Sequence, residues 1–251
     1  MSRWGKRAIA AMILTPSAIL GFMGASWADT LAAVQQLLIA QQCNGCDLAE
    51  ASLSGMQLAG VSLERANLQN ADLQEAVLRS ASLRGADLTQ ANLRAAVLTQ
   101  ADLTGATLTN SNLSEARLAF ADLTQTDLQG ADLTDAIAPE TNFTGAQLAT
   151  ADLSEANLIK AIFTTADLSA INLQGAALTE AYILRTDLSD ADLRAVDFSR
   201  SRLVRSNFDR ADLTDANLRG ANTNRSTFEG TTFCRTIMPD GSQNDADCPP
   251  E

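Results

Sequence analysis

An apolar residue recurs at every fifth position of this chain, from Leu48 to Phe233, without an insertion or deletion. Over these 38 units it is Leu 29 times, Phe six times and Ile once, with Ala138 and Thr223 as the exceptions. The residue two places earlier is Ala in 25 of the 38 units, and the other three positions are mostly polar. A period of five matches neither the 3.6-residue helix nor the two-residue strand. It predicts a short extended segment followed by a bend in every unit.

The first and third residues of each unit have the same parity, so both side chains can point inward from an extended segment. The polar and Gly-containing remainder then faces solvent and supplies the bends. Residues 71–75 (ADLQE) and 101–105 (ADLTG) show the pattern. This A-(D/N)-L-x-x array resembles the pentapeptide-repeat proteins, and the resemblance spans residues 46–235.

The resemblance implies an all-β fold, a right-handed quadrilateral parallel β-helix with four pentapeptides per coil and about 9.5 coils for 38 units. Coils stacked about 4.8 Å apart would make a rod about 45 Å long. Residues 20 apart then become neighbours, so Phe143 and Phe163 form one internal ladder, and Phe208 and Phe228 another. Pro139 lacks an amide hydrogen, which predicts a locally distorted corner.

Residues 1–28 have the pattern of an export signal. Three basic residues precede a mostly apolar run over residues 8–25, and Ser26 and Ala28 are small residues at the −3 and −1 positions of a cleavage site. Cleavage would change the net charge from −12 to −15, because the three basic residues would be lost. If the signal is not cleaved, this segment is the one membrane attachment that we expect.

The segments on either side of the repeat are predicted to cover its ends. Residues 29–45 are predicted to form an N-terminal capping helix, and residues 236–251 a C-terminal tail that folds back over the last coil. One apolar stripe of the helix would pack on the open end of the first coil. The stripe consists of Leu31, Val34, Leu37 and Leu38.

The composition narrows the class of function. The chain has 30 acidic and 18 basic residues and no His. Its acidity argues against direct binding of nucleic acid, which needs a basic surface. We find no nucleophile beside a base, no phosphate-binding loop and no cofactor or metal motif. We therefore predict no catalytic, cofactor or metal site, and a protein that is not an enzyme.

Outward charges divide by face when the units are assigned to four faces. Face one holds the unit centred on Leu48 and every fourth unit after it, and faces two, three and four start at Leu53, Leu58 and Leu63. Their net charges are −8, −7, +2 and +3. The large outward apolar residues fall mainly on faces three and four.

The C-terminal part of face four is the predicted partner patch for an unidentified protein, because apolar groups beside Arg and Tyr are typical of protein interfaces. The alternative is that Val and Ile at outward positions simply suit strand geometry. The patch consists of Tyr182, Leu184, Arg185, Arg202, Val204 and Arg205.

The two acidic faces allow two interpretations. Asp and Asn suit these positions by bonding to nearby backbone, which would leave a solvated surface. Alternatively, a negatively charged rod resembles duplex DNA, and some pentapeptide-repeat proteins bind DNA gyrase in that way. The export signal argues against the second interpretation, because gyrase is cytoplasmic.

The four cysteines lie at the ends of the repeat. An exported chain with an even number of Cys favours disulfides, and the predicted rod holds Cys46 and Cys234 far apart. We predict bonds between Cys43 and Cys46 and between Cys234 and Cys248. A thiol switch at Cys43 and Cys46 is the alternative, since C-x-x-C also occurs in redox proteins.

Together these features predict a non-catalytic, exported structural or protein-binding module, similar to exported cyanobacterial pentapeptide-repeat proteins of the periplasm or thylakoid lumen. The alternative is an acidic, DNA-mimicking regulator of a topoisomerase such as DNA gyrase. A homodimer through the C-terminal end is a further hypothesis, since Phe228 and Phe233 would be incompletely covered there.

Overall fold

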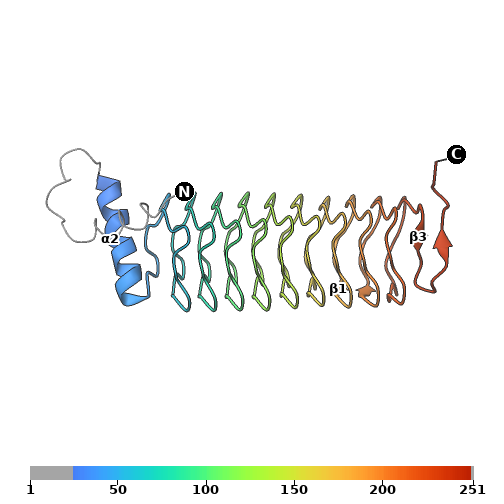
Figure 1. Ribbon diagram of the computed structural model, residues 1–251. Coiled ribbons are helices and arrows are strands. Elements are labelled where there is room, and N and C mark those ends of the chain that lie inside the picture. Colours follow the sequence, from blue (N-terminus) through green and yellow to red (C-terminus); the bar gives the residue numbers. More distant parts are fainter. Residues whose placement is uncertain (1–24, 250–251) are drawn as a thin grey trace, which may run out of the picture.

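The computed structural model describes residues 25–249 as a rod of stacked coils with a helix at one end and a hairpin at the other (Figure 1). Most of the predicted export signal, residues 1–24, lies outside the described residues. Within them, no helix combines the length and apolar character needed to cross a membrane. The elements are α2 (Ala25–Ala40), β1 (Tyr182–Leu184), β2 (Arg202–Val204), β3 (Thr236–Ile237) and β4 (Gln243–Asn244).

Each unit pairs in parallel with the fourth unit after it, as Asp47 does with Asn67. The Leu48 amide donates to the Asn67 carbonyl at 2.7 Å, and the Asn67 amide donates back to the Cys46 carbonyl at 2.9 Å. Strands β1 and β2 pair in the same parallel way on another face, with Tyr182 opposite Arg202. This pairing places four pentapeptides in each coil, so the predicted right-handed quadrilateral β-helix is confirmed.

Most corners are built in the same way, but at the corners before Thr141, Thr186 and Ser206 the amide of that residue does not bond back. The fifth residue of a unit has a left-handed backbone, as at Glu75 (φ 57°). The first amide of the next unit then bonds back across the corner, as Ala76 does to the Leu73 carbonyl at 3.0 Å. Gly suits this conformation best, since other residues adopt it at a steric cost. The stacked ladder holds non-Gly residues there all the same, including Phe120 (φ 61°).

The predicted distortion at Pro139 is confined to the bond across the corner, because the Thr141 amide does not bond back to the Ala138 carbonyl while the ladder is kept. Ladder bonds come from the third and fifth residues of the unit: Ala138 donates to the Asn157 carbonyl at 2.8 Å and Glu140 to the Ile159 carbonyl at 2.9 Å. Glu140 keeps the usual left-handed φ of 55°. Pro139 is the fourth residue of its unit, and the coil ladder does not use the amide at that place. Its missing donor is therefore not needed.

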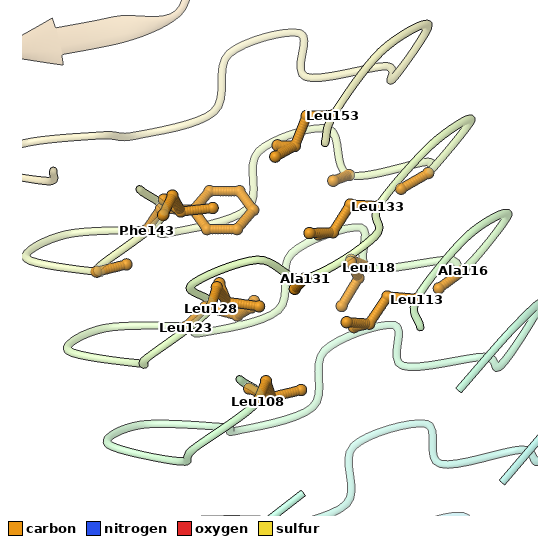
Figure 2. Packing of buried hydrophobic residues seen from close by; sticks show 14 of the residues in the cluster. Leu108, Leu113, Ala116, Leu118, Leu123, Leu128, Ala131, Leu133, Phe143 and Leu153 are labelled. Atoms are coloured by element: carbon orange, nitrogen blue, oxygen red, sulfur yellow. The ribbon is translucent and has the colours of Figure 1, made fainter. Parts of the chain in front are cut away.

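The interior is a column of stacked apolar side chains (Figure 2). The central Leu and Phe residues from Leu48 to Leu218 are all buried, and most first-position Ala residues are buried with them. The Phe143 and Phe163 rings stack with centroids 4.8 Å apart, and Phe208 and Phe228 stack at 5.0 Å. Both predicted aromatic ladders are thus confirmed, and close packing of this kind stabilises the rod along its length.

Several units place Thr or Ser where Ala is usual, and these hydroxyls point inward. Some donate to a carbonyl of the preceding coil, as Thr141 does to Leu118 at 2.7 Å. Others donate across the corner to the preceding unit of the same coil, as Ser111 does to Leu108 at 2.7 Å. Among the described residues, no buried side-chain nitrogen or oxygen lacks a partner. The interior therefore accepts these polar substitutions without an unpaired group.

The coils extend one unit beyond the predicted range at each end. Gln41 has φ 52° and ends the helix, and Gln42 pairs with Ser62 in the first coil. Cys43 is buried at the central position of this extra unit. At the other end, Leu218 donates to the Ile237 carbonyl at 2.7 Å. The β-helix therefore covers residues 41–240, because Cys43 and Met238 continue the register without being Leu or Phe.

The helix covers the first coil with a different face from the predicted one. Leu37 is buried, and Ala33 and Val34 pack partly buried against the core. Leu31 and Leu38 are 48% and 39% exposed, so only half of the predicted stripe contacts the coil. Helix α2 starts at Ala25 and ends at Ala40, where the chain must turn into the first coil. That turn, rather than the apolar periodicity, sets the face that packs.

Both predicted disulfides are present. Cys43 and Cys46 join the third residue of one unit to the first residue of the next, with Cα atoms 5.3 Å apart. Cys234 and Cys248 join the last repeat to the tail, with Cα atoms 4.7 Å apart. Strand β3 pairs antiparallel with β4, and the Asp247 amide donates to the Phe233 carbonyl at 3.0 Å. The tail therefore folds back on the last coil as predicted.

Candidate functional site

Ion pairs join successive coils at several corners of the rod. Asp190 pairs with Arg210 at 2.6 Å, and the two residues occupy the same corner position of successive coils. Glu180 lies between Lys160 and Arg200, at 3.9 and 3.2 Å from their nitrogens. Such exposed pairs are each weak. They do show that charges at the same place in successive coils are within reach of one another.

The acidic faces are built from Asp and Asn that bond to one another and to backbone. The Asn92 amide donates to Asp72 at 3.1 Å, and the Asn172 amide donates to Asp152 at 3.0 Å. Asp72 also accepts from the Gln74 amide at 3.2 Å. This bonding agrees with the interpretation of these columns as a solvated surface held by local hydrogen bonds.

Some acidic groups are further stabilised in their charged form. The Arg194 guanidinium hydrogen-bonds Asp192 and lowers the pKa of that carboxyl, although partial burial opposes the shift. The pKa of Asp215 is lowered by its hydrogen bonds from Arg235. For Asp87, burial acts to raise the pKa, but bonds from the Thr89 hydroxyl and amide outweigh it and the pKa is lowered. These carboxylates therefore serve as acceptors rather than as acid–base groups.

One corner differs, because it stacks three positive charges. Arg185, Arg205 and Arg225 are the fifth residues of consecutive face-four units, with φ of 56°, 58° and 63°. The Arg185 amide donates to the Val204 carbonyl and the Arg205 amide to the Asn224 carbonyl, both at 3.0 Å. Among the described residues, no carboxylate forms an ion pair with these three side chains. We call them the arginine column.

The arginine column borders a surface hollow of about 580 Å³. Leu184 and Val204, both half-buried, form its apolar part. Arg202 also lines it, and its guanidinium lies over the Tyr182 ring, 5.7 Å from the centroid. The full lining is Thr164, Leu184, Arg185, Arg202, Val204, Arg205, Asn224 and Arg225.

The structure brings the predicted partner patch together. Five of its six residues line the hollow, and Tyr182 joins them through its contact with Arg202. The sequence-based patch missed Arg225, Asn224 and Thr164. Arg225 follows Arg205 at the same spacing that separates Arg205 from Arg185, so the pattern that placed the other residues would have found it.

A second group of exposed apolar residues lies on face three. Phe120, Ile137 and Ile159 are 55%, 43% and 36% exposed. Arg117 lies between Val97 and Ile137 in the ladder. In residues 25–249, no group of three or more His, Cys, Asp or Glu side chains is arranged to hold a metal ion.

Comparison with known proteins gives a family match over most of the chain. The profile of pentapeptide repeats matches residues 42–169 and 171–240 in overlapping copies. A similar solved structure is HetL, a pentapeptide repeat protein involved in heterocyst differentiation regulation in the cyanobacterium Nostoc sp. strain PCC 7120. It is 29% identical with a TM-score of 0.69, over 84% of this chain and 98% of HetL. A comparison with curated protein sequences found no match.

Two further structures align more loosely. QnrB1, a plasmid-mediated fluoroquinolone resistance protein, is 18% identical with a TM-score of 0.44, over 71% of this chain and 86% of QnrB1. A pentapeptide repeat protein from the Arabidopsis thaliana thylakoid lumen is 28% identical with a TM-score of 0.21, over 38% of this chain and 59% of that one. Superpositions this loose carry no argument about function.

Proposed function

This chain belongs to the pentapeptide-repeat family, and we propose that it is a non-catalytic module that binds a protein partner in an exported compartment. The observation that carries the proposal is the hollow on face four. Arginines without a carboxylate partner surround half-buried Leu184 and Val204 there, beside the exposed ring of Tyr182. Arg and Tyr around a small apolar centre are typical of residues that dominate protein interfaces.

A non-catalytic role is supported by how the polar groups of the interior are used. The inward hydroxyls of Thr141, Ser206 and Thr231 all donate to backbone carbonyls of the preceding coil. None of them is paired with a base, which a hydroxyl nucleophile requires. Chemistry would therefore have to occur on the outer faces, where the lowered pKa values of Asp192 and Asp215 suit salt bridges rather than proton transfer.

Export is supported by the cysteines and by the pattern of residues 1–28. Disulfides persist in oxidising compartments and are rare in the cytosol. Both ends of the repeat carry one, at Cys43–Cys46 and Cys234–Cys248. The periplasm or the thylakoid lumen would provide such an environment.

The DNA-mimic alternative has weaker support. Its Asp columns are interrupted by Asn side chains whose amides donate to the neighbouring carboxylates, as Asn67 does to Asp47 at 2.9 Å. Duplex DNA instead carries a charge at every step of each strand. An oxidising compartment would also separate this protein from a cytoplasmic topoisomerase.

Location and capture test the proposal together. The full chain, with a C-terminal tag, is expressed in its native host, and the exported fraction is cross-linked and captured. We expect the protein there with its N-terminus at Asp29, and at least one bound protein. A tagged chain found in the cytoplasm with residues 1–28 attached would contradict export.

Three variants connect the captured protein to the hollow. Tyr182→Ala and Arg185→Glu should lose it, whereas Arg65→Glu should retain it. Arg65 has the same corner position and a φ of 55° but lies six coils before Arg185, because each coil has 20 residues. Identical sets of captured proteins from all three would remove the face-four hollow as the binding surface.

A further inference from the structure

The arginine column is unfavourable for the isolated rod. Coils stack about 4.8 Å apart, so neighbouring guanidinium groups repel one another unless an anion lies between them. At two equivalent corners a charge of opposite sign relieves the repulsion, although Glu115, Asp135 and Glu155 also stack with one sign on face two. Glu180 separates Lys160 from Arg200, and Asp215 pairs with Arg235 at 2.6 Å.

The fold does not require arginine at this corner. In the preceding coils the same column holds Gly105, Gln125, Gly145 and Thr165, all with left-handed φ. The ladder bond of the fifth residue is the same whichever side chain is present, as the Gly145 amide donates to the Thr164 carbonyl at 2.9 Å. The bond across the corner differs at Arg185 and Arg205, where the next amide donates to the hydroxyl of Ser206 and Ser226. The three arginines therefore add nothing to the corner that Gly or Thr would not supply.

We infer that the arginine column binds an extended acidic peptide segment of a protein partner. Carboxylates of the segment pair with Arg185, Arg205 and Arg225, and an aliphatic side chain packs on Leu184 and Val204. Arginine is suited to this because its planar fork holds a carboxylate through two hydrogen bonds. The inference rests on the proposed function and names the chemistry of the partner.

The surroundings of the column favour a peptide over other anions. An inorganic anion would make no use of the half-buried Leu184 and Val204 between the arginines. A long polyanion would pass from the hollow onto face one, where Asp187 and Asp209 lie next in the coils and would repel it. A short segment fits within the hollow. Alternate side chains of an extended peptide lie about 6.8 Å apart on one side, within reach of flexible arginines on neighbouring coils.

The test measures binding of a short synthetic peptide to the full-length, oxidised protein. The probe is a fluorescein-labelled peptide of alternating Asp and Leu, and its control replaces every Asp with Asn. We expect a saturable rise in anisotropy for the acidic peptide, at least about tenfold weaker binding for the Asn peptide, and weaker binding at high salt. Equal binding of the two peptides, or no saturable binding, would overturn the inference.

Two substitutions separate binding from folding. Arg205→Glu gives the column the alternating charge of Lys160, Glu180 and Arg200, so it should lose binding at least tenfold while its melting temperature stays equal or rises. Arg65→Glu removes an arginine from the same column near the N-terminal end and should leave binding unchanged. An equal loss in both variants would show that net charge, rather than the hollow, attracts the peptide, and would overturn the inference.

A second copy of this acidic chain is the competing occupant. Sedimentation that shows self-association of the wild-type chain, abolished by Arg205→Glu, would assign the column to a homodimer and overturn the peptide assignment. Capture of an exported partner that is insensitive to Arg205→Glu would overturn this inference and leave the proposed function standing. Specific peptide binding with no captured partner would contradict the proposed function alone.

Discussion

Two corner columns in the C-terminal half of the rod share the left-handed turn and the ladder bonds but differ in their arrangement of charge. Lys160, Glu180 and Arg200 alternate in sign, and Glu180 pairs with both neighbours. The arginine column, Arg185, Arg205 and Arg225, has one sign only and no carboxylate partner among the described residues. All six residues have left-handed φ between 56° and 63°.

The difference shows that the coil determines where a corner side chain is placed but not what it is. Glu180 donates its amide to the Ser199 carbonyl and Arg205 to the Asn224 carbonyl, both at 3.0 Å. Ladder bonds and the filled interior therefore hold both corners, although the Ala181 amide bonds back across its corner and the Ser206 amide donates to the Ser226 hydroxyl instead. In such a repeat the outward residues can change for binding without altering the fold.

Removing an aromatic ring from the interior behind both corner columns should destabilise both of them. Phe163 stacks on Phe143, and its amide donates to the Tyr182 carbonyl at 2.7 Å, directly behind the hollow. We expect Phe163→Ala to lower the free energy of unfolding by about 3–5 kcal/mol, because a buried aromatic ring leaves a cavity. Urea unfolding followed by circular dichroism measures this change. Phe163→Leu is the control and should lower the free energy of unfolding less, since Leu fills this position in most units. A loss of less than about 1 kcal/mol for Phe163→Ala would show that outward contacts carry the stability.

Loss of the C-terminal disulfide should destabilise the arginine column more than the column of Lys160, Glu180 and Arg200. Replacing Cys234 and Cys248 together with Ser opens a loop of sequence separation 14. The expected loss is up to about 3 kcal/mol, because the unfolded tail gains freedom. Hydrogen exchange should rise at the Phe233 and Arg235 amides, which bond to the tail. Exchange that rises equally at Lys160 would mean that the rod unfolds as a whole.

Exchanging the charge pattern between the columns should change stability in opposite directions. Glu180→Arg makes the first column entirely basic, and Arg205→Glu makes the second alternate. We expect Glu180→Arg to lower the free energy of unfolding and Arg205→Glu to raise it, each by about 0.2–1 kcal/mol, the range for exposed ion pairs. Melting temperatures at low and high salt measure both, and the differences should shrink at high salt. Changes of the same sign in both variants would contradict the electrostatic account.

Acid should lower the stability contributed by the Asp–Arg ion pairs, by a smaller amount than the changes above. The Arg210 guanidinium lowers the pKa of Asp190, and Arg194 lowers that of Asp192, from an ordinary value of 3.8. Because the folded pKa values are depressed, this stability is fully present above about pH 3.8 and is lost as the pH falls through the lower folded values. The chain has no His, so melting temperatures should be nearly constant between about pH 5.5 and 8. Asp192→Asn should reduce the acid sensitivity; a steep loss near about pH 6.5 would contradict this account.

The sequence by itself determined the coil, the register and the places of most outward residues. A five-residue period lets Leu and Ala be buried together, and the four units per coil that the family resemblance implied make residues 20 apart neighbours. This arithmetic placed the aromatic ladders, the separation of the two cysteine pairs and five residues of the hollow. It overestimated the effect of Pro139 on the ladder, because the amide that Pro139 lacks is one that the coil ladder does not use.

Only the tertiary structure decided which charges find partners and how the ends are closed. Arg194 pairs with Asp192 of its own unit, and Arg94 pairs with Glu115 of the next coil. Which partner is chosen depends on side-chain reach, which spacing along the chain does not specify. The face of α2 that packs was set by the turn at Gln41, so Leu31 and Leu38 stay largely exposed despite their periodicity. Burial of an apolar repeat is a strong and local constraint that the sequence displays directly. Weak surface interactions depend on three-dimensional distances, and these exist only once the coils have stacked.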